Sequence, residues 1–208
     1  MPQRAIRFTW RPRGFLFAAA AEELIEAAVR DLGLGDRVAR VHVAVAARPQ
    51  GESARVEWGG RSRLRVTLRL DAGNFLTPAG RRAGPARGGL AGVPARRLSR
   101  RTLAATLYHE LGHVADDVLL GVHPAGVTGR RRPAFNEAWN VWLDGRLARR
   151  GRPGVPRAER WRHFLSTFPP PPGAGPGAGD RRREFAALWR AGRLSRAELE
   201  AAARRLDA

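Results

Sequence analysis

The chain has no cysteine, no lysine and no long apolar run. Without cysteine among its 208 residues, disulfide bonds and thiolate chemistry are excluded, and the redox compartment stays open. No apolar stretch approaches the roughly 20 residues that cross a bilayer. Arginines precede a short apolar stretch at residues 15–21, but Glu22 and Glu23 follow it directly. We therefore expect a cytoplasmic protein without membrane association, with secretion as the alternative.

All 38 basic residues are arginine, and the formal net charge is +19. Arginine in place of lysine, together with abundant alanine, glycine and proline, is typical of codon usage in a high-GC genome. The charge therefore does not by itself indicate sequence-specific DNA binding. It does imply long-range attraction to polyanions, so we expect nonspecific nucleic-acid binding through the arginine-rich surface at low salt.

The most informative motif is H-E-x-x-H, formed by His109, Glu110 and His113 with two residues between. On a helix this spacing puts two imidazoles on one face with a carboxylate beside them, a combination that can hold and use a zinc ion. With this composition, the motif should occur by chance only about 0.006 times per chain. The sequence therefore predicts a Zn²⁺ site.

The residues around the motif predict an amphipathic helix. Ser99 is a candidate N-cap. An apolar stripe follows at Leu103, Leu107, Leu111, Val114 and Val118. At about 100° per residue, His109 and His113 fall on the side opposite that stripe. Tyr108 points away from His109, so we interpret it as a packing residue.

A catalytic zinc needs a third protein ligand and an open position for water. Residues 133–144 predict a second helix, with Pro133 in its first turn. One face of this helix has Glu137, Val141 and Asp144, and another has Phe135, Trp139 and Trp142. We expect the aromatic face to pack and the carboxylate face to meet the metal. Glu137 is the preferred third ligand, with His123 as the alternative.

The two motifs together resemble the gluzincin zinc metallopeptidases, especially their minimal members. The resemblance is limited to roughly residues 40–150, and rests on the H-E-x-x-H motif and on Glu137 flanked by Asn136 and Ala138. The metzincin pattern fits less well, because the further histidine and glycine that it requires are Leu119 and Asp116 here.

The resemblance implies an α+β, zincin-like fold. Its parts are a small twisted sheet whose edge strand lines the substrate cleft, then the active-site helix, then the glutamate helix. Zinc would be bound by His109, His113 and Glu137, and Glu110 would be the general base for peptide-bond hydrolysis. Two other hypotheses remain: a zinc-binding scaffold that hydrolyses nothing, and a basic nucleic-acid-associated protein.

The residue that orients a ligand imidazole is left open. Many gluzincins have an aspartate one helical turn after the ligand glutamate, but that position is Val141 here. Asp116, Asp144 and Asn136 are the candidates. The group that stabilises the oxyanion is also open, with His123, His163 and the arginines as candidates.

Other segments predict the scaffold. Residues 18–29 predict a helix, 38–45 a strand, and 55–58 with 64–70 a hairpin. Residues 71–76 are interpreted as the sheet edge beside the cleft, followed by a long loop at 77–98 whose role the sequence leaves open.

The chain is predicted to have three parts. Residues 1–168 form the metallopeptidase domain, 169–179 a proline- and glycine-rich linker, and 180–208 a short helical tail. The tail helices are too small to bury a core alone, so we expect them to dock on the main domain, on a second chain or on a substrate. Substrate sequence and oligomeric state are not predicted.

Overall fold

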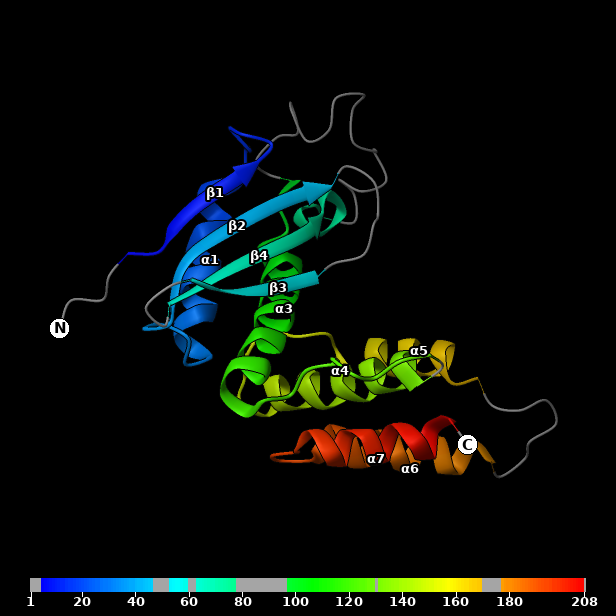
Figure 1. The fold of residues 1–208 in the computed structure, drawn as a ribbon. Coiled ribbons are helices and arrows are strands. Elements are labelled where there is room, and N and C mark those ends of the chain that lie inside the picture. Colours follow the sequence, from blue (N-terminus) through cyan, green and yellow to red (C-terminus); the bar gives the residue numbers. More distant parts are fainter. Residues whose placement is uncertain are drawn as a thin grey trace. The chain divides into compact units, whose positions relative to one another are not determined.

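The computed structural model describes residues 5–46, 53–59, 63–77, 97–129, 131–169 and 177–207. It is a mixed α/β protein, with a four-stranded open sheet and six helices in the described residues (Figure 1). The chain divides into two compact units, Met1–Ala115 and Asp116–Ala208, which are described separately. None of the described helices is both long and apolar enough to cross a bilayer.

The first unit is built on the sheet, whose strand order is β1-β2-β4-β3. The strands are β1 (Arg7–Arg11), β2 (Val38–Ala46), β3 (Ser53–Gly59) and β4 (Arg63–Asp71). β1, β2 and β4 are parallel, and β3 pairs antiparallel with β4. The predicted strand and hairpin are confirmed. β1 was not predicted, although Phe8 and Trp10 alternate with polar residues there.

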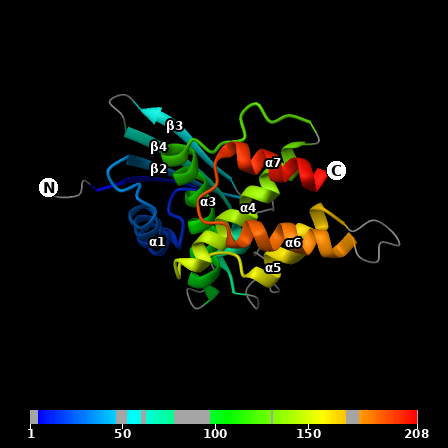
Figure 2. The same cartoon turned by 90° about the horizontal axis from the view of Figure 1, so that it is seen from below.

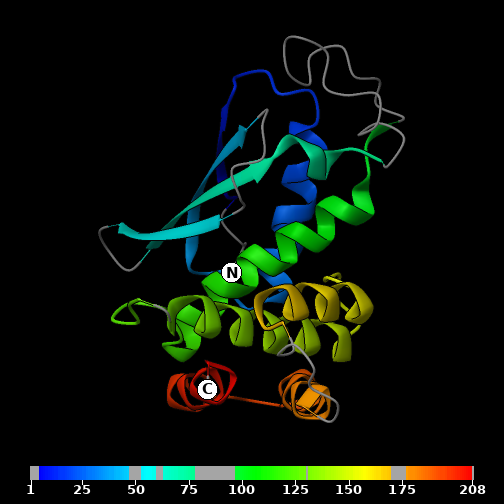
Figure 3. The same cartoon turned by 90° about the vertical axis from the view of Figure 1, so that its right-hand side faces the viewer.

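The inner face of the sheet is the core of this unit. Val41, Val43 and Leu68 are fully buried on it. Helices α1 (Ala18–Asp31) and α3 (Arg100–Leu120) both lie on one face of the sheet (Figures 1 and 3). The predicted first helix is therefore confirmed. The strand alternation turns every second side chain toward these helices, which removes it from water.

The segment predicted as the cleft edge is not a strand. Residues Ala72–Phe75 form the 3-10 helix η1, and Leu76 makes an isolated bridge to Leu98. Phe75 is fully buried, with its ring centroid 4.9 Å from that of Phe15. Burying this ring turns the chain away from the sheet, so β1 and β3 are the edge strands instead. Of the predicted loop 77–98, residues 78–96 lie outside the described residues.

Helix α3 begins and packs as its sequence predicts. The Ser99 hydroxyl accepts a hydrogen bond from the Thr102 backbone N–H at 3.3 Å, which confirms the N-cap. Leu103, Leu107 and Leu111 are fully buried. The apolar stripe is therefore the face that packs in the core.

The second unit contains the last turn of α3 and four further helices. These are α4 (Arg131–Arg149), α5 (Arg157–Thr167), α6 (Gly177–Arg190) and α7 (Arg196–Asp207). α4 and α5 form one layer, and α6 and α7 form a second layer against α4 (Figures 1 and 3; Figure 2 shows them from below). The predicted tail thus packs on the predicted glutamate helix. α6 begins inside the predicted linker, whose residues 170–176 lie outside the described residues.

Helix α4 is buried on more faces than its sequence pattern suggested. Trp142 is fully buried, as the aromatic face predicted, but Glu137 and Asp144 are only 7 % and 0 % exposed. The carboxylate face was expected to meet the metal. It is covered because Arg160 of α5 lies against it and supplies the compensating charge.

A close contact between α4 and α6 explains a glycine inside a helix. A Cβ atom at Gly145 would lie 2.2 Å from the Trp189 carbonyl oxygen. The Arg149 guanidinium donates hydrogen bonds to the carbonyls of Trp189 and Ala191 nearby, where α6 ends. Only a residue without a side chain allows the two helices to approach this closely.

Replacing this glycine should therefore destabilise the second unit. We expect Gly145→Ala to lower the free energy of unfolding by about 1 to 3 kcal/mol, because the two helix backbones must move apart. Gly192→Ala is the matched control, since its Cβ would have no neighbour within 4 Å, and it should change stability by less than about 0.5 kcal/mol. Urea denaturation followed by circular dichroism measures both, and equal stabilities would contradict the close contact.

Candidate metal site

The two histidines of the motif point their ring nitrogens at one another. His109 Nε2 and His113 Nε2 lie 3.2 Å apart, with the ring planes at 87°. Two nitrogens at this distance cannot both carry a hydrogen, because the two N–H groups would collide. The geometry is therefore satisfied either by one shared proton or by one cation bound to both rings.

The separation fits a zinc ion. A tetrahedral zinc bound at about 2.0 to 2.1 Å from each imidazole nitrogen holds the two nitrogens about 3.3 to 3.4 Å apart. The observed separation is within about 0.2 Å of that value, a match usually asked of a metal site. Both rings are half-buried. The pair thus has the donor type and the spacing of two ligands of a zinc ion, and it is partly accessible to solvent.

Glu110 lies between the two histidines in sequence and is only 7 % exposed. The carboxylate is thus held in a largely dry environment on the helix that carries both imidazoles. Tyr108 is also buried, and its hydroxyl donates a 2.5 Å hydrogen bond to Asp31 Oδ2 on α1. This contact supports the prediction that Tyr108 packs and ties α3 to α1.

Glu137, the predicted third ligand, belongs to the second unit. Its Oε2 accepts a 3.4 Å hydrogen bond from Asn140 Nδ2, and its Oε1 lies 3.7 Å from Arg160 Nη1. Oε1 is buried and accepts no hydrogen bond from any described residue. A buried carboxylate oxygen without a donor costs free energy, so this oxygen suits a cation ligand.

Burial raises the pKa of the Glu137 carboxyl above its ordinary value. The positive charge of Arg160 and the hydrogen bond from Asn140 oppose this rise, and the nearby charge of Asp144 adds to it. Arg160 therefore favours the ionised form, which is the form that binds a metal.

Asp144, a candidate for orienting a ligand imidazole, is bound to other groups within the second unit. Its Oδ2 accepts a 2.6 Å hydrogen bond from Arg160 Nε, and its Oδ1 accepts one from the Val155 backbone N–H at 3.3 Å. Arg160 thus connects two buried carboxylates, those of Asp144 and Glu137. This arrangement lets Asp144 position Arg160, and Arg160 position Glu137.

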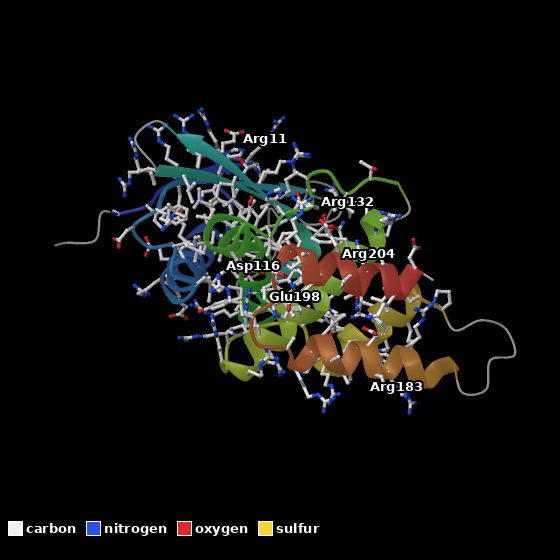
Figure 4. The ribbon with its side chains drawn as sticks, turned by 60° about the horizontal axis from the view of Figure 1, so that its bottom comes forward. Arg11, Asp116, Arg132, Arg183, Glu198 and Arg204 are labelled. Carbon is white, nitrogen blue, oxygen red and sulfur yellow. The ribbon has the colours of Figure 1, made fainter. Side chains whose placement is uncertain are left out.

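Asp116 and Asn136, the other two candidates, have different surroundings. Asp116, labelled in Figure 4, is 1 % exposed and accepts hydrogen bonds from Trp139 Nε1 at 2.9 Å and from Arg146 Nη2. Burial raises its pKa, and the charge of Arg146 opposes the rise. These contacts tie the end of α3 to α4. Asn136 is exposed.

The two histidines outside the motif differ in burial. His123 follows α3 and is half-buried, and its Nδ1 has no hydrogen-bond partner among the described residues. His123 therefore remains the alternative candidate for the third ligand. His163 is exposed on α5, with its Nε2 4.0 Å from Glu159 Oε1.

The sequence analysis did not single out Arg160 or Asn140. A signal for Arg160 was present in the sequence, because it is four residues before Phe164 on α5, and Phe168 follows four residues later at the end of the helix. An arginine in line with apolar residues at helical spacing must meet a buried acid. Asn140 gave no comparable signal, since its contact depends on the Glu137 rotamer.

Within the described part of the chain, no group of three or more histidine, aspartate or glutamate side chains is arranged to hold a metal. Comparison with models of protein families, with curated proteins and with solved structures gave no match to this chain.

The buried charges around Arg160 predict a large stability effect. We expect Arg160→Met to lower the free energy of unfolding by about 3 to 5 kcal/mol, because Asp144 would be left buried without its cation. Arg162→Met, at an exposed position of the same helix, is the matched control and should change stability by less than about 0.5 kcal/mol. Urea denaturation compares the two, and similar losses would show that the buried pair contributes little.

Proposed function

We propose that the protein is a zinc-dependent metallopeptidase of the gluzincin type, with a zincin-like fold. The observation that carries the proposal is the pair of imidazole nitrogens 3.2 Å apart on a capped, buried helix. The order of the elements supports it, since a small sheet precedes the motif helix α3 and the glutamate helix α4 follows. In this proposal His109, His113 and Glu137 would hold the metal.

Each protein group has a distinct part in the proposed reaction. Bound zinc would lower the pKa of a water molecule toward about 7 and polarise the peptide carbonyl. Glu110 takes the proton from the attacking water and delivers it to the nitrogen of the leaving amine. The Glu110 carboxylate is only 7 % exposed and is carried by the same helix as both imidazoles.

Arg160 and Asn140 orient the Glu137 carboxylate in the proposed site. Asn140 donates a hydrogen bond to Oε2 and Arg160 lies near Oε1, so the carboxylate has a fixed orientation and a nearby cation that favours its ionised form. An extended peptide substrate would add to a free edge of the sheet through backbone hydrogen bonds. Among the described strands, β1 and β3 are the two that offer such an edge.

The ligand set predicts which substitutions remove the metal. We expect the purified protein to contain about one zinc ion per chain, and both His113→Ala and Glu137→Gln to lose most of it. Glu137→Gln keeps the size of the side chain, so the packing of α4 should persist. Metal analysis measures zinc, and circular dichroism checks the fold.

His123→Ala separates the two possible third ligands. If Glu137 is the ligand, this variant keeps its zinc and Glu137→Gln does not. The reverse result would move the third ligand to His123 and weaken the gluzincin assignment. His163→Ala serves as the control for loss of an exposed imidazole.

Glu110 should be needed for turnover but not for metal binding. We expect Glu110→Gln to retain zinc and to cleave a mixed peptide library about 100- to 10,000-fold more slowly, because only the proton shuttle is lost. Mass spectrometry of the cleaved library measures the rate. Unchanged turnover would remove Glu110 from its role. A zinc-loaded wild type that cleaves nothing in the library would favour the non-hydrolytic scaffold.

A further inference from the structure

The outer face of the sheet is densely basic. Strand register places seven arginines on it: the half-buried Arg63 at the start of β4, and six exposed ones, of which two are from β1, one from β2, one from β3 and two from β4. The six exposed ones are Arg7, Arg11, Arg40, Arg55, Arg65 and Arg69. We call this surface the basic sheet face. α1 and α3 lie on the opposite face, so the described helices of this unit leave it uncovered.

Three of these arginines lie side by side across the sheet. Arg7 pairs with Arg40 on the neighbouring strand, and Arg40 pairs in turn with Arg65. Adjacent strands are about 4.8 Å apart, and like charges directly opposite one another destabilise a sheet. This row therefore costs the free protein stability. Every basic residue of the chain is arginine, so the residue type is no signal, but composition does not account for three arginines sharing one row.

The face has little acidic charge to offset the row. Glu57 pairs in register with Arg65, and the only other carboxylate that the described strands place on this face is Asp71, at the end of β4. None of the six arginines makes an ion pair with any described residue. The remaining positions are small or polar, and Thr9 and His42 hydrogen-bond to one another at 2.9 Å.

The exposed guanidinium groups of this face favour a partner that presents phosphate groups. Guanidinium groups bind phosphate oxygens through paired N–H donors. The aromatic side chains of β1, Phe8 and Trp10, are on the opposite face by alternation, so the basic sheet face has no platform for stacking unpaired bases. It also has no large apolar side chain that would insert into a lipid surface.

We propose that the basic sheet face binds the phosphate backbone of a nucleic-acid duplex. Binding would depend on the charge and spacing of the phosphates and not on base sequence, because the face has no element shaped to enter a groove. Arg11, labelled in Figure 4, extends the same surface along β1 beyond the row of three. The proposal does not depend on the zinc site, which uses residues of α3 and α4.

The test compares two triple variants that lose the same charge. Arg7→Gln, Arg40→Gln and Arg65→Gln together remove the row on the sheet. Arg157→Gln, Arg162→Gln and Arg182→Gln together remove three exposed arginines of the helical unit. Fluorescence anisotropy measures binding of each full-length protein to a labelled DNA duplex of about 20 base pairs over a range of salt concentrations.

We expect the sheet variant to bind the duplex at least about tenfold more weakly at low salt, and the control variant to bind like wild type. The slope of log affinity against log salt should shrink by about 2.7 in the sheet variant, since each lost phosphate contact removes about 0.9. Thermal melting should show the sheet variant to be at least as stable as wild type, because adjacent like charges are removed.

Several outcomes would overturn the proposal. Equal losses in the two triple variants would mean that net charge alone attracts DNA. Tighter binding to a single strand of the same sequence would contradict a duplex surface. Loss of binding to vesicles containing phosphatidylserine, with duplex binding unchanged, would assign the face to a membrane instead.

Discussion

The packing of one apolar stripe of α3 against the sheet fixes the orientation of the proposed metal site. Leu103, Leu107 and Leu111 are fully buried, and burying each such side chain contributes about 1.5 to 3 kcal/mol. A helix held by that stripe cannot rotate. His109 and His113 therefore stay on the opposite side, one turn apart, where their Nε2 atoms meet at 3.2 Å. The hydrophobic core and the proposed chemistry thus share one helix without sharing a face.

The second unit has an unusual distribution of charge for its size. Asp144, Glu137 and Arg160 are buried together, and charges removed from water stabilise a fold poorly even when they are paired. A hydrophobic trio would pack at least as well. Such an arrangement is understandable where a carboxylate must be kept in a fixed orientation, since Arg160 opposes the rise that burial causes in the pKa of Glu137 and leaves Oε1 without a hydrogen-bond donor. In the proposed function this is the atom that binds the metal.

Local patterns in the sequence predicted the helix of the motif, its Ser99 cap, strand β2 and the β3–β4 hairpin, because these depend on periodicity and on neighbouring residues. Strand β1 was missed because it is short and arginine-flanked. The 71–76 segment was predicted wrongly as an edge strand, because the burial of Phe75 against Phe15 is a tertiary contact that alternation does not reveal. The role of Arg160 could not be predicted from its own helix, because it depends on Glu137 and Asp144 of α4. The row of Arg7, Arg40 and Arg65 likewise could not be predicted, because it depends on the register between strands, which the sequence of a single strand does not specify.

In the proposed site, His109 and His113 bind one zinc ion together. X-ray absorption at the zinc edge tests it most directly, because the outer-shell scattering of imidazole rings is recognisable and their number can be fitted. We expect nitrogen and oxygen ligands at about 2.0 to 2.1 Å with two imidazoles, and one imidazole fewer in His109→Ala. A zinc shell made only of oxygen, or one unchanged by that substitution, would contradict the claim.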